Sequence, residues 1–251
     1  MNFSPPPLQH IGKQFLHYAQ CDSTNRLAQQ LIQDQQLTDG AIIHADEQTA
    51  GRGQQHSRWE STSAQNLTFS VVIFPELPLE QQHYLTIVAS LTIYDTVADL
   101  VSQPVTIKWP NDILCESSKI CGILIQNNLK GRKIHSSVIG MGLNVNQDQF
   151  TTTQATSLAL LTGHYWNREE VLGKLSRNMT HRVEQLQQKD WATLKHEYLE
   201  HLHWKGEMHL FEDGRGSFQG TILGVDASGQ LAVQVDGAIR YYGTKEVIYR
   251  S

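Results

Sequence analysis

The stretch that decides the fold is KWPNDILCESSKICGI, residues 108–123. It joins two apolar runs, 105–109 and 119–126, through a polar turn that contains proline, a pattern typical of two strands and the turn between them. A third apolar run, 136–144, follows the polar segment 127–132. Because such short polar connections join neighbouring strands, the runs predict one sheet that is mostly antiparallel.

The sequence before this stretch adds two strands and two helices. Ser23 or Thr24 can cap a first helix. Runs typical of buried strands follow at 41–45 and 67–74. Between residues 80 and 100, apolar residues recur at spacings of three and four, which predicts an amphipathic helix over one face of the sheet.

The sequence after the strands predicts two further helices. Asn167 with Glu170 resembles a capping box, and Asp190 is expected to start the second of these helices. The first one carries an apolar stripe of Leu172, Leu175, Met179, Val183 and Leu186. Beyond Trp204 the sequence consists of short strand-like runs, in which apolar and polar residues alternate, and these runs predict a small antiparallel barrel. The runs are divided by Asp213-Gly214, Ser228-Gly229 and Asp236-Gly237.

The length of 251 residues fits one main domain with a small appendage. We therefore expect an α+β protein with a main domain over residues 1–203 and a barrel over 204–251. Residues 1–14, with prolines at positions 5, 6 and 7, would form a stiff leader. This leader leaves no room for a helix-turn-helix domain ahead of the core.

Composition and charge argue against a nucleic-acid-binding, membrane or disulfide-rich protein. A formal net charge of −5 gives no broad attraction to nucleic acids or anionic membranes. No apolar run approaches the roughly 20 residues of a membrane helix, and no signal peptide is apparent, so we expect a cytoplasmic protein. Cys21, Cys115 and Cys121 are too widely spread for a disulfide framework or a zinc site of paired cysteines. Histidines such as His201 and His203 are expected at a solvated surface.

The segment ADEQTAGRGQQHSRW, residues 45–59, is the first candidate site. Gly51 and Gly53 can bring backbone N–H groups close to a ligand, while Arg52 and Arg58 can bind a carboxylate or phosphate. A polar loop with two glycines is also an ordinary solvated turn. The segment contains neither a P-loop nor a GxGxxG fingerprint, and both interpretations stay open.

The fold-deciding stretch is the second candidate site. Asp112 offers a hard oxygen ligand for Mg²⁺ and Asn111 an orienting amide, while Lys108 and Lys119 can balance charge on a nucleotide or an activated carboxylate. Gly122, inside a predicted strand, leaves space for a ligand. A hairpin with a charged tip, and with the neighbouring tryptophan in the core, fits the same residues.

The third candidate site, residues 138–147, puts Asn144 and Asn146 on one side of a strand end, where asparagines are also ordinary turn residues.

In this order, and together with Ser-Thr-Asn at 23–25, the three candidate segments resemble those of biotin–protein ligases, also called biotin–acetyl-CoA-carboxylase ligases. The resemblance runs from about Cys21 to Asn146. It implies a catalytic domain related to class II aminoacyl-tRNA synthetases, with a mixed, largely antiparallel sheet flanked by helices, followed by an SH3-like barrel.

The resemblance also implies roles for individual residues. Arg52, Lys119 and Asp112 would be catalytic, and Asp112 would hold the Mg²⁺ that accompanies ATP. The nucleotide would lie against Trp59, Lys108, Asn111, Lys119 and Asn144. Biotin would lie among Ser23, Thr24, Asn25, Gln48, Gly51, Arg52, Gly53, Lys119 and Gly122.

The chemistry implied by the resemblance has two steps. The biotin carboxylate attacks the α-phosphate of ATP to give biotinyl-5′-AMP, and a lysine amine of a biotin carboxyl carrier protein then attacks the mixed anhydride. Because a free lysine has a pKa of about 10.4, a base is needed, and Asp112 is the candidate. In this family the loop often reads GRGR, followed by a glycine two positions later. In this chain Gln54 stands in the place of the second arginine, and His56 stands in the place of that glycine. A cationic contact to the adenylate is therefore missing unless Arg58 replaces it.

Two rival functions remain. Lipoate–protein ligases share the fold and the adenylation chemistry, but the C-terminal barrel and the KWPND run favour biotin. A biotin-sensing transcriptional regulator is the second rival, against which the short leader argues. The partners expected are thus biotin, ATP and a carrier domain, without nucleic acid or membrane, and a homodimer is favoured weakly because homodimers are common.

Overall fold

The computed structural model describes residues 10–51, 53 and 59–250. Its larger sheet has eight strands in the order β1-β2-β3-β8-β7-β6-β5, with β4 paired to β8. Only the β1–β2 pair is parallel among the strand pairs of this sheet, so the prediction of a mostly antiparallel sheet is confirmed. The strands are β1 (Phe15–Cys21), β2 (Ala41–Gln48), β3 (Leu67–Ile73), β4 (Leu77–Pro78), β5 (Val105–Lys108), β6 (Asp112–Cys115), β7 (Ser118–Lys130) and β8 (Lys133–Leu143).

Four parts of this sheet differ from the prediction, and one of them is the two-residue strand β4, which was not predicted. Strand β1 was not predicted, because as an edge strand it is partly exposed along its whole length and its apolar residues do not alternate. Strand β6 was taken as part of a turn. The segment 127–132 was also expected to be a turn, yet β7 continues to Lys130, and its last residues form an exposed hairpin with β8 in which polar side chains are well tolerated.

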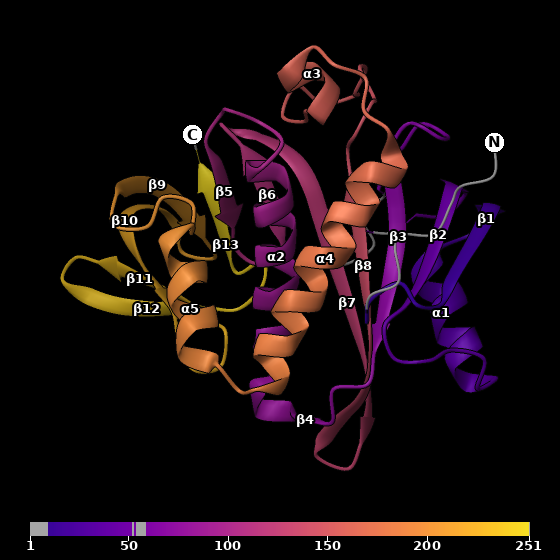
Figure 1. Ribbon diagram of the computed structural model, residues 1–251. Coiled ribbons are helices and arrows are strands. Elements are labelled where there is room, and N and C mark those ends of the chain that lie inside the picture. The colour runs from indigo at the N-terminus through magenta and orange to yellow at the C-terminus, as the bar shows by residue number, and fades with distance from the viewer. Residues whose placement is uncertain (1–9, 52, 54–58, 251) are drawn as a thin grey trace.

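The helices lie on both faces of the sheet (Figure 1). Helices α2 and α4 cover one face, and α1 packs against β3, β8 and β2 on the other. Successive side chains of β2 point to opposite faces of the sheet: Ile42 belongs to the main core, and Ile43 packs with Ala28 of α1. The helices are α1 (Thr24–Gln33), the 3₁₀ turn η2 (Leu79–Gln81), α2 (His83–Ala98), α3 (Leu158–Thr162), α4 (Arg168–Gln187) and α5 (Trp191–Glu200).

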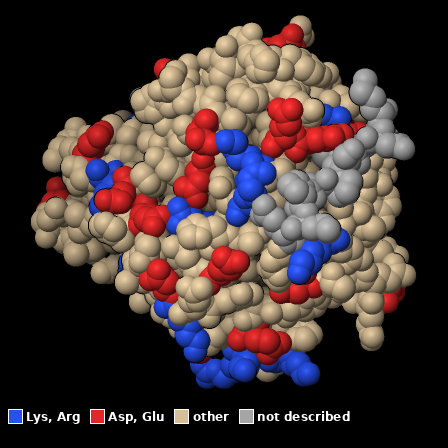
Figure 2. Space-filling model, viewed as in Figure 1, with Lys and Arg blue, Asp and Glu red and all other residues tan. Residues whose placement is uncertain are grey.

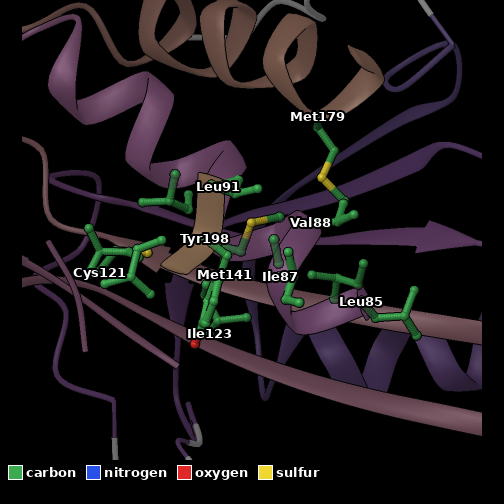
Figure 3. Close-up of a cluster of buried hydrophobic side chains, with 14 of the residues drawn as sticks. Leu85, Ile87, Val88, Leu91, Cys121, Ile123, Met141, Met179 and Tyr198 are labelled. Carbon is green, nitrogen blue, oxygen red and sulfur yellow. The ribbon is translucent and has the colours of Figure 1, made fainter. Parts of the chain in front are cut away.

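Helix α2 packs on one face of the sheet, as predicted, but it is buried on its other side as well, so the expectation that it is amphipathic was wrong. Its apolar residues Leu85, Val88 and Leu91 are fully buried against the sheet and α4 (Figure 3). Its polar residues Thr92 and Thr96 are buried as well. Their hydroxyls donate to main-chain carbonyls one turn earlier, at 2.8 and 2.7 Å, so burial leaves no unsatisfied donor. Helices α4 and α5 cover the side that was expected to face solvent.

The later helices agree with their sequence signals. Asn167 caps α4 by accepting from the Glu169 N–H at 2.8 Å, and Asp190 caps α5. The predicted stripe of α4 is buried. Trp204 then leads into the smaller sheet, and His203 beside it corrects another expectation: it is only 9% exposed, because its ring stacks on Trp204 and hydrogen-bonds Thr106.

The second sheet is antiparallel and five-stranded, in the order β12-β11-β10-β9-β13. Leu231, Val233 and Val235 are buried, as their alternation predicted. The three predicted glycine turns each connect consecutive strands of this sheet. Its strands are β9 (Met208–Asp213), β10 (Gly216–Val225), β11 (Leu231–Val235), β12 (Ala238–Tyr242) and β13 (Val247–Arg250).

The surface carries acidic and basic side chains in close mixture on the face that bears α4 (Figure 2). This agrees with the absence of a strong net charge in the sequence. Among the described residues, no helix is both long and apolar enough to cross a membrane.

Candidate functional site

A cavity of about 530 Å³ lies on the sheet face that carries α1. Side chains on β7 and β8 alternate between the two faces: Cys121 and Met141 point to the core, whereas Gly122 and Gly142 face the cavity. The opposite side of the cavity is closed by β13 of the smaller sheet. The cavity therefore exists because the sheet is glycine-lined where α1 does not cover it.

The glycines of the floor make room for particular side chains. Gly122 and Gly142 are direct cross-strand partners. A Cβ atom on Gly142 would come within 2.4 Å of the Trp59 ring, and one on Gly122 within 3.0 Å. A Cβ on Gly140 would come within 2.2 Å of Asn25 Oδ1. The glycines thus let Trp59 lie flat on the sheet and let Asn25 approach it closely.

A charged group stands at one end of the cavity. Register places Lys108, Asp112, Gly122 and Gly142 opposite one another on successive strands, so the first two side chains stand on the same face as the glycines. Lys119 Nζ lies 2.6 Å from Asp112 Oδ1 and 5.6 Å from the centre of the Trp59 ring. Burial, aided by the charge of Lys119, lowers the pKa of Lys108, although Asp112 opposes this shift. Two ammonium groups beside one carboxylate form a site suited to an anion.

A network of neutral hydrogen bonds stands at the other end, at the start of α1. Ser70 is fully buried on β3, and its hydroxyl oxygen lies 2.7 Å from both Thr24 Oγ1 and Asn25 Oδ1, so its single proton can be donated to either of them. The Thr24 main-chain N–H donates to Gln48 Oε1 at 2.8 Å. Asn25 Nδ2 donates to Leu124 O at 3.1 Å. The network fixes amide and hydroxyl groups without any net charge, as expected for recognition of a polar, uncharged group.

The smaller sheet contributes a wall and is tied to the fold-deciding stretch. Tyr249 of β13 lines the cavity, and Lys108 Nζ lies 4.9 Å from the centre of its ring. The Trp109 indole donates to the Gly229 carbonyl at 3.0 Å. Trp109 is also 7% exposed and belongs to the core, as the hairpin interpretation predicted, and it lines the cavity as well.

Most of the predicted site residues meet in this cavity. Gly51 does not line it, although its carbonyl accepts from Trp59 N at 3.1 Å and so joins the two ends of the loop. The predictions for Arg52, Gln54, His56 and Arg58 fall outside the described residues. The predicted residues that do line the cavity are Ser23, Thr24, Asn25, Gln48, Gly53, Trp59, Lys108, Asn111, Asp112, Lys119 and Gly122.

Asn144 is not brought to the cavity. It follows the end of β8, is 3% exposed, and its amide donates to the Thr156 carbonyl at 2.9 Å. Asn146 likewise donates to the Trp166 carbonyl. These two asparagines hold loops in place, and the role of Asn144 as a nucleotide contact stays a prediction.

Some cavity residues were missed from the sequence. Gly140 and Gly142 alternate inside an otherwise apolar strand, which is a recognisable signal of close approach to that face. Ser70 does not itself line the cavity but hydrogen-bonds Thr24 and Asn25, which do, and it gave no such signal, because a serine in a buried strand is not distinctive. Tyr249 could not be found, since only the tertiary fold brings β13 against β5 and β6.

The fold and the cavity define an α+β protein whose cavity suits a small molecule with a polar, uncharged part and an anionic part. Residues 17–144 match the Biotin/lipoate A/B protein ligase family, and the chain belongs to this family.

Similar proteins with solved structures or curated names span nearly the whole chain. The biotin protein ligase of Aquifex aeolicus, solved with biotin and ATP, superposes with a TM-score of 0.78 at 26% identity over 95% of this chain and 99% of that one. The biotin–[acetyl-CoA-carboxylase] ligase of Paracoccus denitrificans is 28% identical over 92% of this chain and 98% of its own length. The bifunctional ligase/repressor BirA of Bacillus subtilis is 27% identical over 92% of this chain and 72% of its own length.

Proposed function

We propose that this chain is a biotin–protein ligase, which forms biotinyl-5′-AMP from biotin and ATP and transfers biotin to a lysine of a biotin carboxyl carrier protein. The observation that carries the proposal is the single cavity that joins a neutral hydrogen-bonding end to a doubly cationic end. Family membership and the named ligases that match nearly the whole chain support it.

The two substrates divide the cavity between them. Biotin binds with its ureido ring against the network of Thr24, Asn25 and Gln48, whose hydroxyl and amides match a neutral donor-acceptor ring. Its carboxylate then points toward Lys119. The adenine of ATP stacks on the flat face of Trp59, and its phosphates lie toward Lys108. Ser23, Gly53, Asn111 and Gly122 complete the two subsites.

Magnesium fits the donor set at the charged end. Asp112 presents a carboxylate to the cavity, and one or two carboxylates plus substrate phosphates are the usual ligands of Mg²⁺. Bound there, the ion would supply positive charge to the phosphates. Lys119, which pairs with Asp112, would supply a further positive charge to the same phosphates.

In the first step, an oxygen of the biotin carboxylate attacks the α-phosphorus, the bond to the bridging oxygen breaks, and pyrophosphate leaves. Lys108 and Lys119 hold the two anionic reactants together, which offsets their repulsion. In the second step, the lysine amine attacks the acyl carbon, the acyl–oxygen bond breaks, and AMP leaves. Asp112 receives the proton of the amine in this proposal. Arg52 is proposed as a further cation on the reacting groups.

The finer parts of the description are proposals as well. We propose that the larger sheet is a class II aminoacyl-tRNA synthetase-like domain ending at residue 203, and that 204–251 form an SH3-like barrel. The antiparallel pairing of the five later strands supports the second point. Location in the cytoplasm, a homodimer and the lack of DNA binding also stay predictions.

The lipoate alternative is disfavoured by the relatives, since those with substrate-specific names are biotin ligases. Exchange of pyrophosphate with ATP distinguishes the two acids. We expect exchange that requires biotin and that ignores lipoate, because the neutral network matches a ureido ring and lipoate has none. Exchange that depends on lipoate alone would overturn the proposal.

A further inference from the structure

A second cluster of functional side chains lies on the face of the sheet opposite the cavity, at its β1 edge. The parallel register of β1 and β2 pairs His17 with His44, and their ring centres are 5.3 Å apart. Asp46 lies two residues along β2, so its side chain is on the same face as that of His44. His17 Nε2 and Asp46 Oδ2 are 2.8 Å apart. One ligand atom from each of the three residues lies within 4.8 Å of the others.

We propose that His17, His44 and Asp46 bind one divalent first-row transition metal ion, with Zn²⁺ as the probe. Two imidazoles and one carboxylate are borderline ligands that favour Zn²⁺, Co²⁺ or Ni²⁺ over Mg²⁺. Tetrahedral coordination at roughly 2.0–2.1 Å places ligand atoms about 3.3 Å apart. The spacing already observed, up to 4.8 Å, therefore requires only small side-chain movements.

Two of the three groups, His44 and Asp46, are in protonation states that suit a metal. Burial lowers the pKa of His44 to about 3, so its ring is neutral at physiological pH and keeps a nitrogen lone pair. Burial would raise the pKa of Asp46, but hydrogen bonds from His17 and Arg168 hold that pKa below its ordinary value, and the group is a carboxylate. Neither ligand has to lose a proton for the ion to bind.

Arg168 sets the geometry and limits the affinity. Its Nη1 lies 3.0 Å from Asp46 Oδ1, so this oxygen is occupied and only Oδ2 faces His17. The carboxylate would therefore bind the ion through one oxygen only. Arg168 orients it through the other oxygen, as hydrogen-bonding partners of metal ligands commonly do. The positive charge of the guanidinium opposes a cation, so binding is expected to be reversible by EDTA.

The ion would join the edge strand β1 to its neighbour β2, which ends at Gln48 in the cavity. Its effect would thus be to stabilise the strand pair that carries part of the site. It takes no part in the chemistry proposed above, so the two proposals fail independently.

The test uses the untagged full chain, stripped with EDTA, and titrates Zn²⁺ by calorimetry and Co²⁺ by visible absorption. One equivalent should bind, with the intense visible bands of tetrahedral Co²⁺. At 100 times Kd, Zn²⁺ should raise Tm by about 5 °C or more. His17→Gln and Asp46→Asn should each weaken binding at least about ten-fold.

The matched control is His10→Gln, because His10 and Asp39 form a histidine–carboxylate pair without a second imidazole beside it. This variant should bind Zn²⁺ as the wild type does. Circular dichroism checks that each variant is folded. The proposal is overturned if the wild type takes up no stoichiometric metal, or if folded His17→Gln and Asp46→Asn both bind Zn²⁺ as tightly as the wild type.

Discussion

At the scale of single residues, the floor of the cavity depends on the absence of a side chain at Gly142. An added methyl group would come within 2.4 Å of the Trp59 ring, and the backbone beneath it is held in β8. Gly142→Ala should therefore displace Trp59 and raise KM for ATP by about ten-fold or more, since overpacking costs about 1–3 kcal/mol. Steady-state kinetics with ATP varied measures it. Gly214→Ala, where nothing lies within 4 Å, is the control and should change neither kcat nor KM.

Lys119 carries the second residue-scale prediction. It pairs with Asp112 and lies over Trp59, between the two proposed subsites. Lys119→Met should slow biotin-dependent pyrophosphate exchange by about 10²-fold, because a preorganised charge on the reacting groups is lost. Lys130→Met, at the exposed end of β7, supplies the comparison. Equal exchange rates in the two variants would remove Lys119 from the mechanism.

How far the sequence predicts the site depends on how each residue signals its role. Lys119 and Gly122 are recognisable because a charged residue and a glycine interrupt strand-like runs. Ser70 is not, because its role comes from two acceptors on α1 that only the packed structure brings near it. Asn144 has a structural role that its position after a strand did not reveal, since its amide donates to a loop carbonyl, and its role as a nucleotide contact stays a prediction.

At the scale of elements, three helices are joined by one buried side chain. Arg182 of α4 is 6% exposed, lies 2.8 Å from Asp95 of α2 and lies 2.5 Å from Glu197 of α5. Arg182→Leu should lower the free energy of unfolding by about 3 kcal/mol, because two carboxylates lose their shared partner. Urea denaturation checks this value. Arg132→Leu removes an ion pair with Glu80 that is largely exposed, and should leave stability unchanged.

Elements with strong periodicity or buried runs were predicted well from the sequence. Strand β3, with every residue buried, and helix α4, with its apolar stripe, are examples. Strands β1 and β6 were missed because β1 is a half-exposed edge and β6 has only four residues. The surroundings of α2 could not be predicted either, since its outer face is buried only by the later packing of α4 and α5.

At the scale of the whole molecule, the two sheets meet where His203 hydrogen-bonds Thr106 of β5 at 3.0 Å. Burial, with help from the charges of Lys108 and His209, lowers the pKa of His203 to about 4, although Glu207 opposes the shift. The unfolded chain, with a histidine pKa near 6.5, binds this proton more readily. The contribution of His203 to the free energy of unfolding is therefore fully present above about pH 6.5. It is lost as the pH falls toward 4, at up to about 1.4 kcal/mol per pH unit.

Urea denaturation between pH 7.5 and 5 measures that dependence. His203→Gln should reduce the slope of stability against pH over this range, because glutamine keeps a hydrogen-bonding group and does not titrate, while the buried His44 keeps its own contribution to the slope. His196→Gln, at an exposed position on α5, should leave the slope as it is in the wild type. A slope that is unchanged by His203→Gln would assign the acid sensitivity to other groups.

The central claim concerns the whole molecule acting on a partner, and mass spectrometry of that partner tests it most directly. A biotin carboxyl carrier domain is incubated with this protein and Mg-ATP, with biotin in one sample and lipoate in a second, and its intact mass and peptides are measured. The account predicts one biotin on one lysine, dependent on ATP. A carrier that stays unmodified, or one that accepts lipoate in place of biotin, would contradict it.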